Sequence, residues 1–445
     1  MTRTTHLASL LAIAALTTLT ACQPQAEREV DGAVAWQSLT TVADGDGHRG
    51  PWRMNESEFH YVDDPAVALS GDGDSLVAWV DNRAKEIFLT RIDSRGEPRD
   101  AGPTRVSSSP EVFSWLPRLI VAPDERQVLV TWQEIEFTGG SHGGEILLAR
   151  SEDGGASFAE PVNLSNSRAG AGKGRLDAET WDNGSLDLVL AADGTVLVAW
   201  TEYEGRLKVV HSTDGGRSFS DPVHVAGDGD RPARAPALTA AGDTVLVAWT
   251  FGEDPAADIH IAASDDRGGS FSTPRPVHER PGHADAPALA VADDGTVHLV
   301  HAEGRDGPQG PGQLVYTRSA GNPLTFEPAR VVLEQSPRAR AHAGFPELAA
   351  AGEQVIIAWH ILELERPVAL GLGLMHSDNG GGRFSGPELI PGTEPPEGGI
   401  GGGLQGLLTR KLATDASGSV ALAHSLFVPD QASQIKLVRG RLVEP

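Results

Sequence analysis

The chain has 445 residues, 40% of them hydrophobic and 5% aromatic, with 52 glycines, 30 prolines and one cysteine. It contains 36 Lys and Arg residues and 61 Asp and Glu residues, which gives a formal net charge of −25. A field of that sign repels nucleic acid and anionic bilayers, so neither is expected as a direct partner. The single cysteine excludes an intramolecular disulfide, and short apolar runs between glycines and prolines favour an all-β protein.

The amino terminus has the pattern of a secretory signal. An apolar stretch over residues 7–19 is too short to span a membrane and ends in the letters LTAC. These letters resemble a bacterial lipobox, which implies lipid attachment at Cys22. We therefore expect a lipoprotein signal peptide over residues 1–21, a lipidated tether over residues 22–33 and a place outside the cytoplasm, at the outer membrane or cell surface. An ordinary signal peptide cut near Ala21 is the alternative.

Residues 34–445 read as a single domain of repeated units. In each unit two short apolar runs precede one aligned position, and further runs follow it, so a unit offers about four strands. Four strands form the blade of a β-propeller, and such units bury their apolar faces only by stacking on one another. The aligned positions predict seven blades and, because they recur at one place, indicate side chains that pack within the blades: Trp79, Trp132, Trp200, Trp249, His301, Trp359 and His424.

The last unit ends after its third run, at residues 435–438. Residues 34–42 form a β-like run with no partner of their own. We expect this run to supply the missing outer strand, because closing the ring in this way removes two exposed sheet edges.

Three turns share the pattern Ser-x-Asp-x-Gly-x-Ser-Phe and begin at Ser151, Ser212 and Ser264. In such a turn the Asp can accept hydrogen bonds from the backbone and the glycine permits positive φ, which indicates a structural role. The turns resemble the Asp-box, or BNR repeat, of the sialidase-like propellers. That resemblance implies a β-propeller, with the six blades of sialidases as the alternative count. It also implies an exo-sialidase-like glycoside hydrolase as the alternative function.

A sialidase site, as the resemblance implies it, needs three arginines, a tyrosine nucleophile paired with a glutamate, and an aspartate. Asp63 stands where the first arginine is expected, so an intact sialidase is not predicted. The candidates for the remaining roles are Asp81, Glu202 and Tyr203. Tyr316 falls within a third strand, where we expect it to be packed.

In propellers the connections from an outer strand to the next inner strand, and from second to third strands, share one face with the central channel. An acidic protein that gathers arginines, histidines and unrepeated tryptophans there is predicted to bind an acidic or glycan-like ligand. Each residue taken singly indicates a solvated loop charge, so the prediction rests on the clustering alone. The candidate ligand-binding residues are Arg83, Arg234, Arg340, Arg410, Trp115, Trp181, His283 and His342.

No cofactor is expected. The pairs Asp44 with Asp46 and Asp228 with Asp230 suggest calcium but lack the ligand count of a calcium loop. The leading prediction is thus a monomeric envelope lipoprotein whose propeller binds a glycan or a protein and reaches the membrane only through its anchor.

Overall fold

The computed structural model describes residues 32–47, 60–109, 112–137, 142–166, 186–202, 205–253, 257–278, 283–304, 312–364, 368–402 and 409–443. The regular structure in these ranges is β-strand. Within them, no helical segment has the length and apolarity that crossing a membrane requires. The strands all lie in Gly32–Pro445, which forms one compact unit.

Twenty of the strands form five separate four-stranded sheets. From inner to outer strand, the first two sheets are β2 (Val62–Leu69), β3 (Ser75–Asp81), β4 (Glu86–Ile92) and β5 (Thr104–Arg105), then β6 (Phe113–Val121), β7 (Val128–Phe137), β8 (His142–Ser151) and β9 (Val162–Asn163). The next three are β10 (Leu186–Leu190), β11 (Val196–Thr201), β12 (Leu207–Ser212) and β13 (Val223–Ala226), then β14 (Ala233–Ala241), β15 (Thr244–Phe251), β16 (Asp258–Ser264) and β17 (Arg275–Pro276), then β18 (His283–Val291), β19 (Val297–Gly304), β20 (Gly312–Arg318) and β21 (Arg330–Leu333).

The remaining strands form one nine-stranded sheet. It contains β22 (Ala341–Ala351), β23 (Gln354–Glu363), β24 (Ala369–Ser377), β25 (Glu388–Leu389), β26 (Ile400–Gly401), β27 (Leu412–Thr414), β28 (Ser419–Val428), β29 (Ala432–Leu442) and β1 (Val34–Gly45). Short β26 pairs with both β24 and β28, and so joins two groups that otherwise match the four-stranded sheets.

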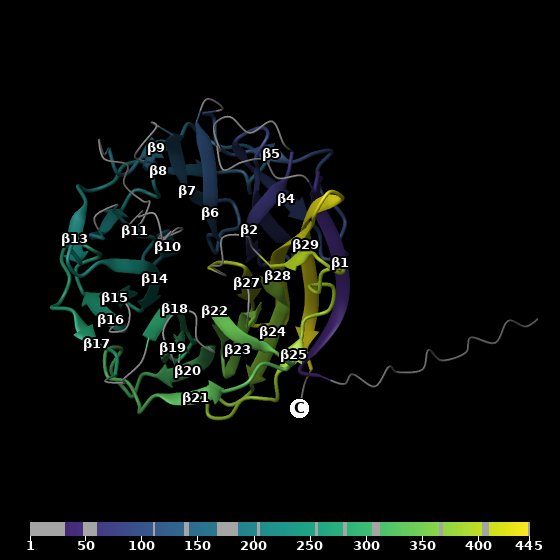
Figure 1. Ribbon diagram of the computed structural model, residues 1–445. Coiled ribbons are helices and arrows are strands. Elements are labelled where there is room, and N and C mark those ends of the chain that lie inside the picture. The colour runs from purple at the N-terminus through teal and green to yellow at the C-terminus, as the bar shows by residue number, and fades with distance from the viewer. Residues whose placement is uncertain are drawn as a thin grey trace, which may run out of the picture. The chain divides into compact units, whose positions relative to one another are not determined.

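The inner strands surround a common axis, as Figure 1 shows. Successive contacts run from β2 through β6, β10, β14, β18, β22 and β27, and β27 in turn contacts β2. The predicted all-β propeller is therefore confirmed. The number of blades stays a prediction, because β26 merges the last two groups into one sheet.

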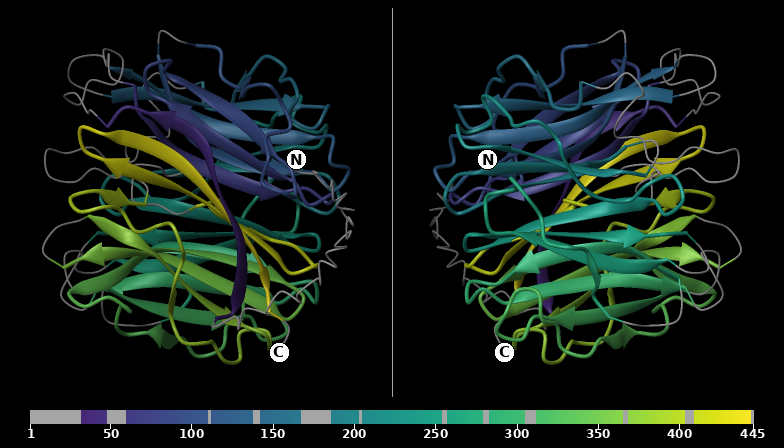
Figure 2. Two further views of the ribbon diagram at one scale, coloured as in Figure 1. Left: turned by 90° about the vertical axis from the view of Figure 1, so that its right-hand side faces the viewer. Right: turned by 90° about the vertical axis from the view of Figure 1, so that its left-hand side faces the viewer.

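The amino-terminal strand pairs with the carboxy-terminal one. β1 runs antiparallel to β29, from Val34 opposite Leu442 to Gly45 opposite Ser433, and Figure 2 shows β1 in purple beside yellow β29. This pairing confirms the predicted outer strand and covers an edge that would otherwise be free.

Alternating strand directions give the ring two distinct ends. The turn end carries the inner-to-second and third-to-fourth turns, and the loop end carries the second-to-third and outer-to-inner connections.

The aligned tryptophans and histidines are packed inside the blades, as predicted. Trp79 is 6% exposed and the other six members of the column are 0% exposed. Burying large aromatic rings is a major favourable term in such packing.

Each predicted Ser-x-Asp turn is closed by its own side chains and docks on the preceding sheet. In the first turn, the Gly155 N–H donates to Ser151 Oγ at 2.8 Å and the Ser157 N–H donates to Asp153 Oδ1 at 2.9 Å. Gly155 has a φ of +85° and leaves no room for a Cβ beside Leu89 of β4. The turns thus connect neighbouring sheets as well as neighbouring strands.

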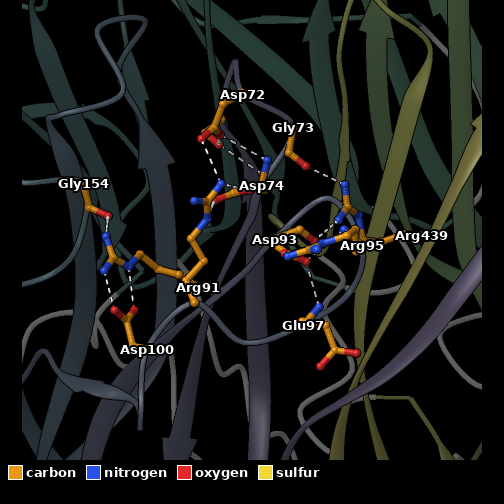
Figure 3. A network of polar contacts seen from close by, with 12 residues as sticks. Asp72, Gly73, Asp74, Arg91, Asp93, Arg95, Glu97, Asp100, Gly154 and Arg439 are labelled. Carbon is orange, nitrogen blue, oxygen red and sulfur yellow. Dashed lines mark hydrogen bonds and ion pairs between the residues drawn. The ribbon is translucent and has the colours of Figure 1, made fainter.

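Arginines strengthen the junction where the ring closes (Figure 3). Arg439 of β29 donates to the carbonyl oxygens of Asp93 and Gly73, both in turns of the first sheet. Arg91 of that sheet pairs with Asp100 at 2.6 Å and also donates to the Gly154 carbonyl of the second sheet at 3.4 Å. One chain of contacts therefore links three successive parts of the ring.

Candidate functional site

Five of the inner strands bulge near their first residues. The pairings of β2, β6, β14, β18 and β22 each shift register there, and a non-glycine residue with positive φ lies in each shift. A bulge re-aims the side chains beside it. Sequence reasoning missed this feature, although each of these residues precedes a proline: Asp64, Leu116, Ala235, Ala286 and Phe345.

Charged residues from several inner strands gather on the axis. We call the following residues the axial cluster: Asp63, Asp64, Arg118, Asp187, Glu347, Arg410 and Lys411. Asp64 Oδ1 lies 3.1 Å from Lys411 Nζ and 4.0 Å from Arg118 Nη1, and both cationic side chains are 0% exposed. Burial of this kind is costly unless the charges compensate one another.

Within the described ranges, several atoms of the axial cluster make no hydrogen bond beyond the ion pairs of Asp64. They are Asp63 Oδ2, both carboxylate oxygens of Asp64, Lys411 Nζ, and Nε and Nη2 of Arg118. Buried polar atoms in native proteins are almost always satisfied by protein, by ordered water or by a ligand. The axial cluster thus keeps unused hydrogen-bonding capacity.

Arg410 spans the centre of the ring. Its Nε donates to Asp187 Oδ1 of β10 at 2.8 Å, and its backbone N–H donates to Glu347 Oε2 of β22 at 2.8 Å. Its carbonyl accepts from the Val67 N–H of β2 at 2.7 Å. One residue therefore connects three inner strands and fixes the orientation of its own guanidinium.

Two carboxyl groups of the axial cluster are shifted toward the protonated form. Burial raises the pKa of Glu347 to about 8, with Arg410 opposing and Asp187 adding to the shift. Burial, followed by the charge of Asp64, raises the pKa of Asp63, and the Ser425 hydroxyl donates to Asp63 Oδ1 at 2.5 Å. Glu347 therefore retains its proton through neutral pH.

Two histidines, one in the aligned column and one next to Trp359, lie close to Lys411. Burial lowers the pKa of His360 to about 3 and that of His424 to about 4. Both are 0% exposed. They are neutral at physiological pH and add no further positive charge to the axis.

Two of the predicted ligand-binding residues come together at the loop end. Burial lowers the pKa of His283, the charge of Asp285 opposes that shift and the charge of Arg234 adds to it. Asp285 Oδ1 accepts from the Thr250 hydroxyl at 2.8 Å, which holds the carboxylate between β15 and β18. Arg234 on β14 thus supplies a cation, and His283 and Asp285 on β18 of the adjacent sheet supply a neutral imidazole and a hydrogen-bond acceptor.

Other predicted residues are more dispersed. Trp115 is 2% exposed, and its Nε1 donates to Gln133 Oε1 at 3.1 Å. Arg340 is exposed, and its carbonyl accepts from the Leu364 N–H. His342 is half-buried, with Nδ1 3.3 Å from the Ala343 carbonyl oxygen.

The candidate catalytic residues do not form a common site in the described residues. Asp81 accepts from the backbone N–H groups of Arg83 and Ala84, and its other oxygen lies 2.9 Å from His60 Nε2, while the Arg83 side chain is exposed. Glu202 is half-buried and its N–H donates to the Arg206 carbonyl. Tyr203, Trp181 and Cys22 lie outside the described residues.

Tyr316 is packed, as predicted. It is 1% exposed, its hydroxyl oxygen lies 2.7 Å from His298 Nδ1, and burial raises its pKa above the usual value for a phenol. A phenol in this environment is a poor nucleophile.

The suggested calcium pairs serve local structure. Asp44 Oδ1 accepts from Gln434, and Asp228 Oδ1 accepts from the N–H groups of Asp230 and Arg231. Among the residues described, no group of three or more His, Cys, Asp or Glu side chains could hold a metal ion.

No family model and no curated protein matches this chain. Solved structures are similar to it. The polysaccharide lyase Uly1 aligns with a TM-score of 0.56 and 11% identity over 92% of this chain and 100% of that one. A PL25 ulvan lyase, bound to a saccharide of GlcA and sulfated Rha, aligns with a TM-score of 0.52 and 14% identity over 89% and 94%. A protein of unknown function from Dyadobacter fermentans aligns with a TM-score of 0.50 and 15% identity over 76% of this chain and 99% of that one.

The chain is a β-propeller. Identities this low establish the fold alone. Membership of the Asp-box family stays a prediction that rests on the three turns and their recurrence.

Proposed function

We propose that this protein is a lipid-anchored, seven-bladed propeller of the bacterial cell envelope that binds an acidic glycan at the loop end of its ring. The observation that carries the proposal is the position of Arg234 beside the imidazole of His283 at the loop end, in a chain whose net charge is −25. Arg234 lies on β14 and His283 on the neighbouring inner strand β18, and the charge of Arg234 adds to the lowering of the pKa of His283.

An acidic sugar suits these groups. Guanidinium groups pair with carboxylates through two parallel hydrogen bonds, and an arginine already held in place loses little side-chain entropy when it binds. The two lyases named above act on polysaccharides, and the ligand of one contains GlcA, a sugar with a carboxylate. Both points support an anionic glycan over a neutral one.

A glycan-binding assay tests the proposal. Isothermal titration with uronic-acid oligosaccharides and with matched neutral oligosaccharides should show binding of the acidic set only. Arg234→Ala should weaken that binding at least tenfold. Arg217→Ala is the matched control, because Arg217 is an exposed arginine at the turn end. Equal binding by wild type and Arg234→Ala would contradict the assignment of the site.

Hydrolysis of a glycan is the second candidate function. It is favoured by Glu347, because a buried carboxyl that keeps its proton at neutral pH is the form a general acid needs. Incubation with a fluorogenic sialoside, a panel of neutral glycosides and a uronate polysaccharide would reveal turnover. Turnover that is lost in Glu347→Gln or Tyr203→Phe would replace the binding-only view, and no turnover on the whole panel would dismiss hydrolysis of those substrates.

The anchor is tested separately. Cells fed a labelled lipid precursor should incorporate the label into the wild-type protein and not into Cys22→Ser. An unlabelled wild-type protein would exclude lipid attachment, and with it the proposed membrane location.

A further inference from the structure

A cavity of about 470 Å³ lies on the axis beside the axial cluster. Its walls combine apolar side chains with polar groups and come from the inner strands β2, β6, β14, β18, β22 and β27. Ser70, Gly71 and Asp415 also line it, and they belong to inner-to-second turns, so the cavity extends to the turn end of the ring. It is thus distinct from the loop-end surface proposed above for a glycan.

Three polar groups on the cavity wall have hydrogen-bonding capacity to spare within the described part of the chain. Arg410 uses Nε and Nη2 for Asp187 and for the carbonyl oxygens of Leu188 and Leu238, which leaves Nη1. Glu347 uses Oε2 for the Arg410 N–H, which leaves Oε1. Thr239, next to Leu238, also lines the cavity and carries a hydroxyl group. The other polar side chains at the turn end are engaged: Ser70 with Asp72, Thr414 with Ser419, and Asp415 with Ser417 and Ser419.

We propose that this cavity binds a small carboxylate-bearing molecule of about monosaccharide size, with Arg410 Nη1 as the principal donor and Glu347 and Thr239 as its companions. The cavity volume lies in the range of small-molecule sites, and such sites place a few polar groups among apolar side chains, as Arg410, Glu347 and Thr239 are placed here. Because Asp187 and the two carbonyls already hold the guanidinium, binding does not have to order it.

Protonation controls this site. Burial raises the pKa of Glu347 to about 8, so below that pH its carboxyl can donate a hydrogen bond to a bound carboxylate, and above it the ionised group repels the ligand. The other charged groups that face Glu347 or the cavity are Asp187 on β10, Arg118 on β6, Arg410, and Asp415 at the turn end. The expected binding is therefore tighter below pH 8 than above it.

Isothermal titration of the purified protein with glucuronate, and with uncharged glucose as the matched sugar, tests the inference. Wild type should bind glucuronate and not glucose, with affinity that falls at least tenfold from pH 7 to pH 9. Glu347→Gln keeps a donor at every pH and should bind without that fall. Thr239→Val should weaken binding severalfold, and Arg217→Ala should not change it.

Arg410→Gln should abolish glucuronate binding if the variant folds. If it does not fold, the Glu347→Gln and Thr239→Val results test the inference in its place. The inference would be overturned if wild type showed no saturable binding of glucuronate at millimolar concentration, or if it bound glucose equally well. It would also be overturned if the affinity of wild type, like that of Glu347→Gln, were the same at both pH values. The acidic-oligosaccharide test with Arg234→Ala addresses the other end of the ring and can succeed or fail independently.

Discussion

Arg410 Nε and Asp187 Oδ1 lie 2.8 Å apart, although 223 residues separate them in the chain. The pair joins the segment before β27 to β10, so it connects opposite sides of the ring. Arg410 is 27% exposed at its side chain and Asp187 only 4%, so the carboxylate is the more deeply desolvated partner. This ion pair orients the guanidinium on which the inferred carboxylate site depends.

Replacing Asp187 by Asn should destabilise the fold. The Asn side chain still accepts a hydrogen bond, but the Arg410 charge loses its partner, and breaking a buried pair in this way costs about 3 kcal/mol of unfolding free energy. Urea denaturation of wild type and Asp187→Asn would measure the difference. Asp193→Asn is the control, because Asp193 pairs with the exposed Arg267 and its loss should cost less than about 1 kcal/mol.

The docking of the turns on preceding sheets can be tested with two glycines of equal backbone conformation. Gly155 has a φ of +85° and packs against Leu89, whereas Gly194 has a φ of +84° and, among the described residues, no atom within 4 Å of the place that a Cβ would take. Gly194→Ala should cost about 1 kcal/mol for the left-handed backbone, and Gly155→Ala about 1 to 3 kcal/mol more for overpacking. Equal losses in chemical denaturation would show that the turn does not depend on contact with the preceding sheet.

The buried histidines should contribute stability that rises with pH on the acidic side of neutrality, a slope opposite to the one that Glu347 contributes through its raised pKa. The pKa of His424 is about 4 in the folded protein and near 6.5 when unfolded, so the unfolded chain binds more protons between these values. Its contribution is complete above pH 6.5 and is lost as the pH falls toward 4, at up to about 1.4 kcal/mol per pH unit. His360 should add a similar slope.

The slope is measurable by denaturant unfolding between about pH 4.5 and 6.5. His424→Gln should make the change of stability with rising pH less positive than in wild type, whereas His224→Gln, which removes an exposed histidine, should leave it unchanged. A profile that is unchanged in His424→Gln would refute the assignment of the pH dependence to the buried ring.

Deleting β1 should weaken the entire ring. Without Val34–Gly45, β29 becomes a free edge and the last group of strands loses its outer member. We expect one cooperative transition at lower temperature, with faster hydrogen exchange also in β2 and β3, which lie beyond the deleted pairing. A chain that begins at Gly32 is the control. Loss of protection confined to β29 would mean that closure matters only locally.

Much of the fold was predictable because its signals are local and repeated. Trp132 and Trp200 end matching apolar runs, and the turns at Ser151 and Ser212 repeat the same spacing, so the strands of each unit can be predicted from that unit alone. The unpaired run in residues 34–42 needed only the observation that the last unit was one strand short. The prolines after Leu116 and Ala235 were visible too, but their meaning as bulges emerged only with the strand register.

By itself, the sequence determined the β-propeller fold, the packing of the aligned column and the meeting of the two chain ends, because period-two patterns and tight turns depend on neighbouring residues. Only the tertiary structure decided which charges meet on the axis. Arg410, Arg234 and Arg340 look alike along the chain, yet Arg410 crosses the centre to Asp187, Arg234 lies near His283 and Arg340 is exposed. Where a side chain points in a closed ring depends on the summed rotation of all preceding units and on bulges that redirect single residues, and no local pattern encodes that sum.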